Sequence, residues 1–251
     1  MDILLTNDDG IHAPGLRYIY HALKKAGHSV QVVAPLTEQS AVGHAITLSS
    51  PLRMTEIKEN GFEGIAVNST PADCIKFALS VIYKDKLPDL VFSGINAGPN
   101  VGPDVMYSGT VAAATEASHN GCKAIALSFN SRRLIDLCEY ADYAVELGAR
   151  VKWEGIAPRT VLNINFPNLP FARCKGLRIC PQTSAVWRDH YEQRSDPEGR
   201  PYWWISGIIP QEDVAPDTDY ALLSEGFITL TPLRFDFTNR EALDALKNLE
   251  S

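Results

Sequence analysis

The chain begins with Met1-Asp2-Ile3-Leu4-Leu5-Thr6-Asn7-Asp8-Asp9-Gly10, an apolar run that ends at two adjacent acids and a glycine. Such a run predicts a buried strand over residues 3–6. Apolar residues then recur at helical spacing over 16–25, Gly27 is a stop signal, and residues 30–34 predict a second strand. Strand, helix and strand in this order form a βαβ unit, which predicts parallel strands joined by a right-handed crossover.

The same alternation continues as far as residue 165. Further strands are predicted at 89–93, 124–128 and 160–165, and helices at 72–83, 108–119 and 134–152, the last with an apolar stripe that starts at Leu134. This pattern is typical of an α/β, Rossmann-like fold with a mostly parallel, doubly wound sheet. Because ligands bind such sheets at the carboxyl ends of the strands, the loops that follow strands are where chemistry is expected.

The C-terminal part of the chain has a different character. Residues 181–225 show no clear period and contain prolines, charges and the aromatic side chains between Trp187 and Trp204, which predicts irregular structure with short hairpins. A strand and a helix are predicted after it, at 227–231 and 239–249. We therefore divide one continuous domain into a Rossmann-like core over 1–180 and an oligomerising arm with a strand-helix tail over 181–251.

Composition limits the partners. The 251 residues carry a formal net charge of -7, and since nucleic-acid grooves need a basic excess, we expect no nucleic-acid partner. Five cysteines without a Cys-x-x-Cys pair predict reduced, mostly buried thiols. The N-terminus has no basic region before its apolar run, and no apolar stretch approaches the ~20 residues that span a bilayer. We expect a cytoplasmic protein without a membrane partner.

Asp8 and Asp9 come directly off the first predicted strand. A turn at a strand end lets both carboxylates face one point, and two such charges side by side are costly unless a cation lies between them. The alternative is helix capping, in which an aspartate accepts backbone N–H bonds. The residues alone leave both interpretations open.

The loop after the second strand contains Ser40, followed by His44, and His12 lies near the two aspartates. A serine in a loop is commonly a turn residue, although its hydroxyl can be a ligand. Either histidine could transfer a proton, and either could equally be a polar surface or packing residue. The local sequence around Ser40, His12 and His44 does not by itself assign them a role.

Two further segments suggest phosphate binding. Residues 93–102 are glycine-rich, so the backbone can approach a ligand closely and form an anion nest, or simply a tight loop. Ser108-Gly109-Thr110 opens an alanine-rich helix, whose N-terminus suits a phosphate by geometry and dipole, with plain capping by Ser108 as the alternative. All the ligand candidates are oxygen donors, which favours Mg²⁺ or Mn²⁺ over zinc.

Several motifs together resemble the SurE family, the survival-protein nucleotidases. They follow family order and cover nearly the whole chain: 7–15 (NDDGIHAPG), 34–35, 39–43, 93–100 (SGINAGPN), 104–111 (DVMYSGTV), 217–221 and 226–233. Ala112 and Ala117 stand where glycine is common in relatives. Since alanine keeps a helix close-packed, this departure changes little.

The resemblance implies hydrolysis of nucleoside 5'- and 3'-monophosphates, and of short polyphosphate, with one divalent cation (Mn or Mg) per subunit. It implies Asp8 and Asp9 as catalytic residues, and a homo-oligomer, dimer or tetramer, that exchanges a C-terminal segment. The implied metal ligands are Asp8, Asp9, Ser40 and Asn96, and the implied phosphate-binding residues are Asn96, Ser108, Gly109 and Thr110. Because the ligands and the 108–110 run lie on different loops, we expect substitutions in that run to leave metal binding unchanged.

Two other interpretations are considered. A haloacid-dehalogenase-type phosphatase needs an Asp-x-Asp pair, whereas here Gly10 holds the second position after Asp8. A nucleotide-binding sensor without catalysis fits the same fold, because fold alone does not fix function. A sensor would bind nucleotide and release no phosphate.

Overall fold

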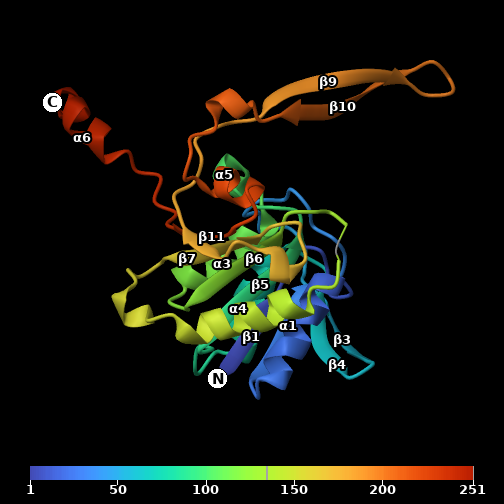
Figure 1. Cartoon of the computed structure of the whole chain (residues 1–251). Helices are drawn as coiled ribbons and strands as arrows, with labels where there is room; N and C mark the ends of the chain where they lie inside the picture. The colour runs from blue at the N-terminus through green and yellow to red at the C-terminus, as the bar shows by residue number, and fades with distance from the viewer. Residues whose placement is uncertain (134, 251) are drawn as a thin grey trace.

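A computed structural model describes residues 1–133 and 135–250 (Figure 1). The strands of its main sheet are β1 (Asp2–Thr6), β2 (Ser29–Pro35), β3 (Met54–Glu59), β4 (Phe62–Val67), β5 (Leu90–Ala97), β6 (Ala124–Phe129), β7 (Val161–Phe166), β8 (Leu177–Ile179) and β11 (Ile228–Leu233). They lie in the order β3-β4-β2-β1-β5-β6-β7-β11-β8. All pairs from β4 to β7 are parallel, while β3 and β11 run antiparallel to β4 and β7. The prediction of a mostly parallel, doubly wound sheet is confirmed.

Helices cover both faces of this sheet (Figure 1). The helices that pack on it are α1 (Pro14–Lys25) and α4 (Cys138–Arg150) on one face, and α2 (Pro71–Phe77) and α3 (Gly109–His119) on the other. Successive strand residues point to opposite faces, so Ile3 and Leu5 join the α1–α4 core whereas Leu4 joins the α2–α3 core. The apolar spacing of α1 buries Leu16, Ile19 and Leu23 completely, as the sequence predicts.

The winding direction reverses between β1 and β5, which are neighbours in the sheet. The chain leaves β1 for α1 on one face and leaves β5 for α3 on the other. The carboxyl ends of two such strands are where doubly wound sheets bind their ligands. Gly15, in the first turn of α1, lets this helix approach β5 closely, since a Cβ there would come within 1.9 Å of the Ile95 carbonyl oxygen. The fold thus brings the loops after β1 and β5 to one rim.

The arm and the tail project from this body (Figure 1). The arm is an antiparallel hairpin of β9 (Arg188–Ser195) and β10 (Pro201–Ile208), which form a separate two-stranded sheet. Two short helices belong to the same part of the chain, α5 (Asp219–Ser224) and α6 (Arg240–Leu246). β11 lies between β7 and β8 inside the main sheet, so the range 181–251 supplies part of the core as well as the arm.

Some elements differ from their predicted bounds. β5 continues to Ala97, four residues into the glycine-rich segment, and α4 begins at Cys138, while the predicted stripe residue Leu134 lies outside the described residues. The β3–β4 hairpin was not predicted, although Asn60-Gly61, both at positive φ (48° and 78°), is a strong two-residue turn signal. Within the described residues, no helix combines the length and apolar character that crossing a bilayer requires.

Candidate active site

Asp8 and Asp9 lie at the rim, immediately after β1. Asp8 is buried, with 4% of its surface exposed, and its Oδ1 accepts a hydrogen bond from the hydroxyl of Thr110 on α3. Oδ2 of Asp9 accepts a hydrogen bond from the backbone N–H of Ala97 at 2.9 Å, across the gap to β5. Neither carboxylate caps α1, since the residue before that helix is Ala13 and makes no side-chain cap. The capping alternative for the two aspartates is therefore wrong.

Ser40 reaches the same place through the loop after β2. The backbone N–H of Gln39 donates to the Asp8 carbonyl oxygen at 2.8 Å, which fastens this loop to the end of β1. Ser40 itself is exposed, and its hydroxyl donates to the Glu38 carboxylate. The Ser40 oxygen therefore keeps lone pairs for another partner.

Asn96, the fourth implied ligand, sits near the end of β5, next to Ala97. Its side-chain nitrogen donates to the Gly98 carbonyl oxygen at 2.8 Å, which orients the amide and leaves its oxygen available as an acceptor. Asn96 precedes Ala97, whose backbone N–H bonds Asp9. Ser40 follows Gln39, whose backbone N–H bonds Asp8. The structure thus gathers Asp8, Asp9, Ser40 and Asn96 on one rim.

The first turn of α3 completes this rim. Ser108 caps the helix, because its hydroxyl accepts from the Val111 backbone N–H at 3.1 Å. Gly109 packs against Asp8, since a Cβ there would lie 2.8 Å from the Asp8 Cβ and 3.0 Å from Pro71 Cγ. The loop that carries Asp8 and the 108–110 run are therefore in direct contact. A substitution in the 108–110 run can thus displace Asp8, so the expectation that metal binding stays unchanged needs a direct test of Mn²⁺ binding.

The electrostatics of the pair call for a positive charge. Burial raises the pKa of Asp8 to about 6 against the opposing hydrogen bond from Thr110, and the Asp9 charge raises it further. Burial also raises the pKa of Asp9, and the Glu38 charge adds to that effect. The ion pairs found among the described residues include neither carboxylate. A buried and a half-buried carboxylate side by side, without a basic partner, fit a divalent cation, and their oxygen donors suit Mg²⁺ or Mn²⁺.

The arrangement is not a cluster of acids and histidines. In the described part of the chain, no three His, Cys, Asp or Glu side chains approach closely enough to hold a metal by themselves. The two carboxylates would have to be supplemented by the neutral oxygens of Ser40 and Asn96. Such mixed oxygen sets are ordinary for Mg²⁺, which also keeps several waters.

A buried polar network supports the loop after β5, and the sequence analysis missed it. Asn100 donates to the Ser128 hydroxyl at 2.7 Å, and its carbonyl oxygen accepts from the side chains of Asn163 and Asn165 at 2.7 and 2.9 Å. Two asparagines two residues apart in a buried strand share one face, which is a signal that the sequence does contain. The network fixes the path of the chain between Asn96 and α3.

Asp219, on α5, holds the same loop from the arm side. This carboxylate is fully buried and accepts backbone N–H bonds from Gly102, Thr183 and Tyr220, each at 2.8 Å. Burial raises its pKa, while these three bonds oppose the shift. One side chain therefore joins the loop between β5 and α3 to the base of the arm.

Neither candidate histidine contacts the acidic pair. His12 is exposed and pairs with Glu59 on β3 at 3.0 Å. His44 pairs with Glu116, in the second half of α3, at 2.9 Å, and its ring stacks on His119 with the centroids 6.4 Å apart. In these positions both histidines tether neighbouring elements of the fold.

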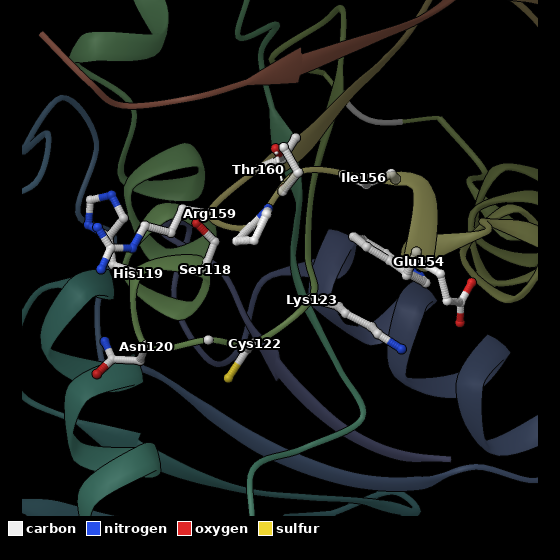
Figure 2. Close-up of a pocket in the computed structure, with 13 residues that line it drawn as sticks. Ser118, His119, Asn120, Cys122, Lys123, Glu154, Ile156, Arg159 and Thr160 are labelled. Carbon is white, nitrogen blue, oxygen red and sulfur yellow. Dashed lines mark hydrogen bonds between the residues drawn. The ribbon is translucent and has the colours of Figure 1, made fainter. Parts of the chain in front are cut away.

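An open depression of about 650 Å³ lies elsewhere, at the amino ends of β6 and β7 (Figure 2). Its lining comes from the end of α3 and the segment before β7 and includes His119, Lys123, Glu154 and Arg159. α3 separates it from the rim, since the rim contacts the first turn of that helix. The depression shares no residue with the candidate site.

Fold and rim together define a doubly wound α/β protein with an oxygen-donor site at its topological switch point. The family model described as "Survival protein SurE" matches residues 3–189. "5'-nucleotidase SurE" of Nitratidesulfovibrio vulgaris (strain DP4) is 59% identical over 250 residues, covering 100% of both chains. The protein of the same name from Lawsonia intracellularis (strain PHE/MN1-00) is 41% identical over 250 residues, covering 100% of this chain and 98% of its own.

A solved structure supports the same assignment. The structure described as "Crystal Structure of Sure Protein from Aquifex aeolicus" aligns with a TM-score of 0.87 at 38% identity, covering 100% of both chains. The chain belongs to the SurE family.

Proposed function

We propose that this chain is a divalent-metal-dependent nucleotidase, which releases phosphate from nucleoside 5'- and 3'-monophosphates. The observation that carries the proposal is the adjacent pair Asp8–Asp9, which has no basic partner among the described residues. Asp8 is buried and packed against the N-terminus of α3, and Asp9 is half-buried beside it. The names of the relatives, 5'-nucleotidase SurE, support the substrate class.

The metal ligands in this proposal are Asp8, Asp9, Ser40 and Asn96. When bound, a divalent cation neutralises the two carboxylates, binds a phosphate oxygen and lowers the pKa of a bound water. The chain's own contribution is orientation: Ala97 N–H holds Asp9, and the contact between Gln39 and Asp8 holds the loop of Ser40.

The substrate phosphate is proposed to lie at the start of α3, over Ser108, Gly109 and Thr110. The backbone N–H groups of a first helical turn and the helix dipole both favour a phosphoryl group there. Asn96 is proposed to contact the same phosphate. Fixed donors of this kind stabilise charge on the transferring group without reorganisation.

A phosphate-release panel tests the proposal. We expect release from nucleoside 5'- and 3'-monophosphates, and from short polyphosphate, with Mn²⁺ or Mg²⁺, and no release after EDTA treatment. Full activity in thoroughly chelated protein would rule out the metal. Nucleotide binding without phosphate release from any compound would favour the sensor.

We further propose a cytoplasmic homo-oligomer, a dimer or a tetramer. The support is the arm, whose aromatic side chains Trp203 and Trp204 are 54% and 58% exposed in the single chain. Free cysteines fit a reducing compartment. A stable monomer at micromolar concentration in light scattering would refute the assembly.

A further inference from the structure

The hydroxyl of Thr110 is turned to Asp8 and is closed off from the outside. Thr110 has no exposed surface, and its Oγ1 donates to Oδ1 of Asp8. A threonine hydroxyl carries a single proton, so a hydroxyl that donates to Asp8 has no proton left for a substrate phosphate. In this arrangement the side chain of Thr110 belongs to the acidic pair.

Gly109 shows how closely helix and acid are fitted. A Cβ on Gly109 would lie 2.8 Å from the Asp8 Cβ, closer than real Cβ contacts come, and 3.0 Å from Oδ2, which is a tight contact. The first turn of α3 therefore packs directly on the Asp8 side chain. Asp8 is confined by this packing on one side and oriented by the Thr110 hydroxyl through Oδ1. Among the described residues, the one side-chain donor to the Asp8 carboxylate is Thr110, and it bonds Oδ1 and not Oδ2.

We propose that Thr110 is a positioning residue of the metal site: its hydroxyl holds Oδ1 of Asp8 and leaves Oδ2 to the cation. The inference rests on the proposed function, since it assigns a role toward the metal of that same site. Groups that hydrogen-bond a ligating carboxylate fix its orientation, and their loss typically lowers metal affinity about 10- to 100-fold. Phosphate would be held by the backbone of the same turn.

Calorimetric titration of Mn²⁺ without substrate is the primary test. Thr110→Val keeps the shape of the side chain and removes the hydroxyl, so we expect a 10- to 100-fold weaker Mn²⁺ affinity, on the order found for such contacts. Thr110→Ser keeps the hydroxyl and should restore most of the affinity. Thr115→Val is the matched control, because Thr115 is equally buried on α3 and donates only to the Val111 carbonyl oxygen.

Kinetics distinguish positioning from phosphate binding. At saturating Mn²⁺, Thr110→Val should keep the wild-type inhibition constant for inorganic phosphate, and its loss of kcat/KM at low Mn²⁺ should be relieved as Mn²⁺ is raised. The opposite pattern, unchanged Mn²⁺ affinity with weaker phosphate inhibition, would show that the hydroxyl is a phosphate ligand and would overturn the inference.

A second variant covers the case in which Thr110→Val does not fold. Gly109→Ala keeps the hydroxyl but displaces Asp8, and it should weaken Mn²⁺ at least 10-fold, on the same scale. Wild-type affinity in a folded Gly109→Ala protein would contradict the inference. If the wild-type protein binds no Mn²⁺, the inference is wrong whatever its turnover. If Thr110→Val weakens Mn²⁺ in a protein that releases no phosphate, the inference stands and the proposed function fails.

Discussion

The rim of the sheet and the β9–β10 hairpin are built in opposite ways. At the rim, polar side chains are buried and bonded within the chain, as Asp8 with Thr110 and Asp219 with three backbone N–H groups show. In the hairpin nearly every residue is exposed, including Trp203 and Trp204. The hairpin is held together by strand pairing and makes little contact with the core (Figure 1).

This difference in burial predicts that substitutions in the two regions affect different properties of the protein. Substitutions at a rim whose buried polar side chains bond to neighbouring elements should change turnover and folding of the chain. A hairpin whose large aromatic side chains stay exposed gains its apolar burial only against another surface. Four predictions, in order of decreasing effect, sharpen or break this comparison.

The largest effect is expected from Asp9→Asn. The change removes a charge from the proposed metal site, which should lower turnover on the order of 10²-fold or more because several kcal/mol of transition-state stabilisation are lost. Phosphate release at saturating Mn²⁺ measures it. Asp213→Asn, at the base of the arm where it pairs with Arg188, is the control and should retain wild-type turnover. Near-normal turnover of Asp9→Asn would show that the carboxylate of Asp9 is not needed for phosphate release.

Asp219→Ala should destabilise the protein strongly. It leaves three buried N–H groups without an acceptor, which should lower the free energy of unfolding by about 3–5 kcal/mol. Urea unfolding measures the change, with Glu225→Ala as the control, because Glu225 is exposed and caps the opposite end of the same helix. If Asp219→Ala lowers the free energy of unfolding no more than Glu225→Ala does, the three bonds of Asp219 contribute little to stability.

Glu116→Gln should have a moderate effect that depends on pH. Hydrogen bonding to His44 lowers the pKa of Glu116 to about 2, against burial and with help from Lys76, while His119 stacks on His44. A carboxylate with a lowered pKa stabilises the fold above its ordinary pKa of 4.5, and this stability is lost as the pH falls toward 2.

The wild-type protein should therefore exceed Glu116→Gln in unfolding free energy by about 1–3 kcal/mol at pH 7. The difference should shrink between pH 4.5 and pH 2, the ordinary and lowered pKa values. Urea melts across this range test it. A difference that stays constant with pH would show that shape, and not charge, holds the loop of His44 to α3.

The smallest effect on the core is expected from removing the hairpin. Arg188 and Ile208 face each other in register, so an Asn-Gly turn can join them in place of the residues between. The far-UV circular dichroism and the thermal midpoint of the core should change little, while the mass from light scattering should fall. An unfolded core, or an unchanged mass, would show that the two regions are not independent in this way.

The sequence predicted the parts of the fold that depend on local pattern. The apolar runs of β1, β2, β5, β6 and β7 and the spacing of α1 were sufficient, since parallel strands buried on both faces leave a clear apolar signal. The β3–β4 hairpin was missed although Asn60-Gly61 indicates it. The places of β8 and β11 in the sheet depend on pairing between distant segments, which local pattern does not contain.

The candidate site likewise has a part that the sequence predicts and a part that depends on contacts between distant segments. That the loops with Asp8, Ser40 and Asn96 would meet follows from the geometry of parallel strands, whose carboxyl ends share one edge. The bond from Thr110 to Asp8 could not be predicted, because it depends on how α3 seats on the end of β1 and on two side-chain rotamers. The roles of Asp219 and of the asparagine network depend likewise on contacts between segments far apart in the chain.

The Asp219 clamp has a consequence for the order in which the protein becomes complete on the ribosome. Its partner Gly102 is synthesised 117 residues earlier, and the N-terminal part of a chain emerges first. A nascent chain therefore presents Asp8, Ser40, Asn96 and the start of α3 well before the residue that fixes the loop between them has been made. The side chains of the candidate site are thus synthesised early, whereas the contact that fixes the loop between them waits for Asp219 in the C-terminal part of the chain.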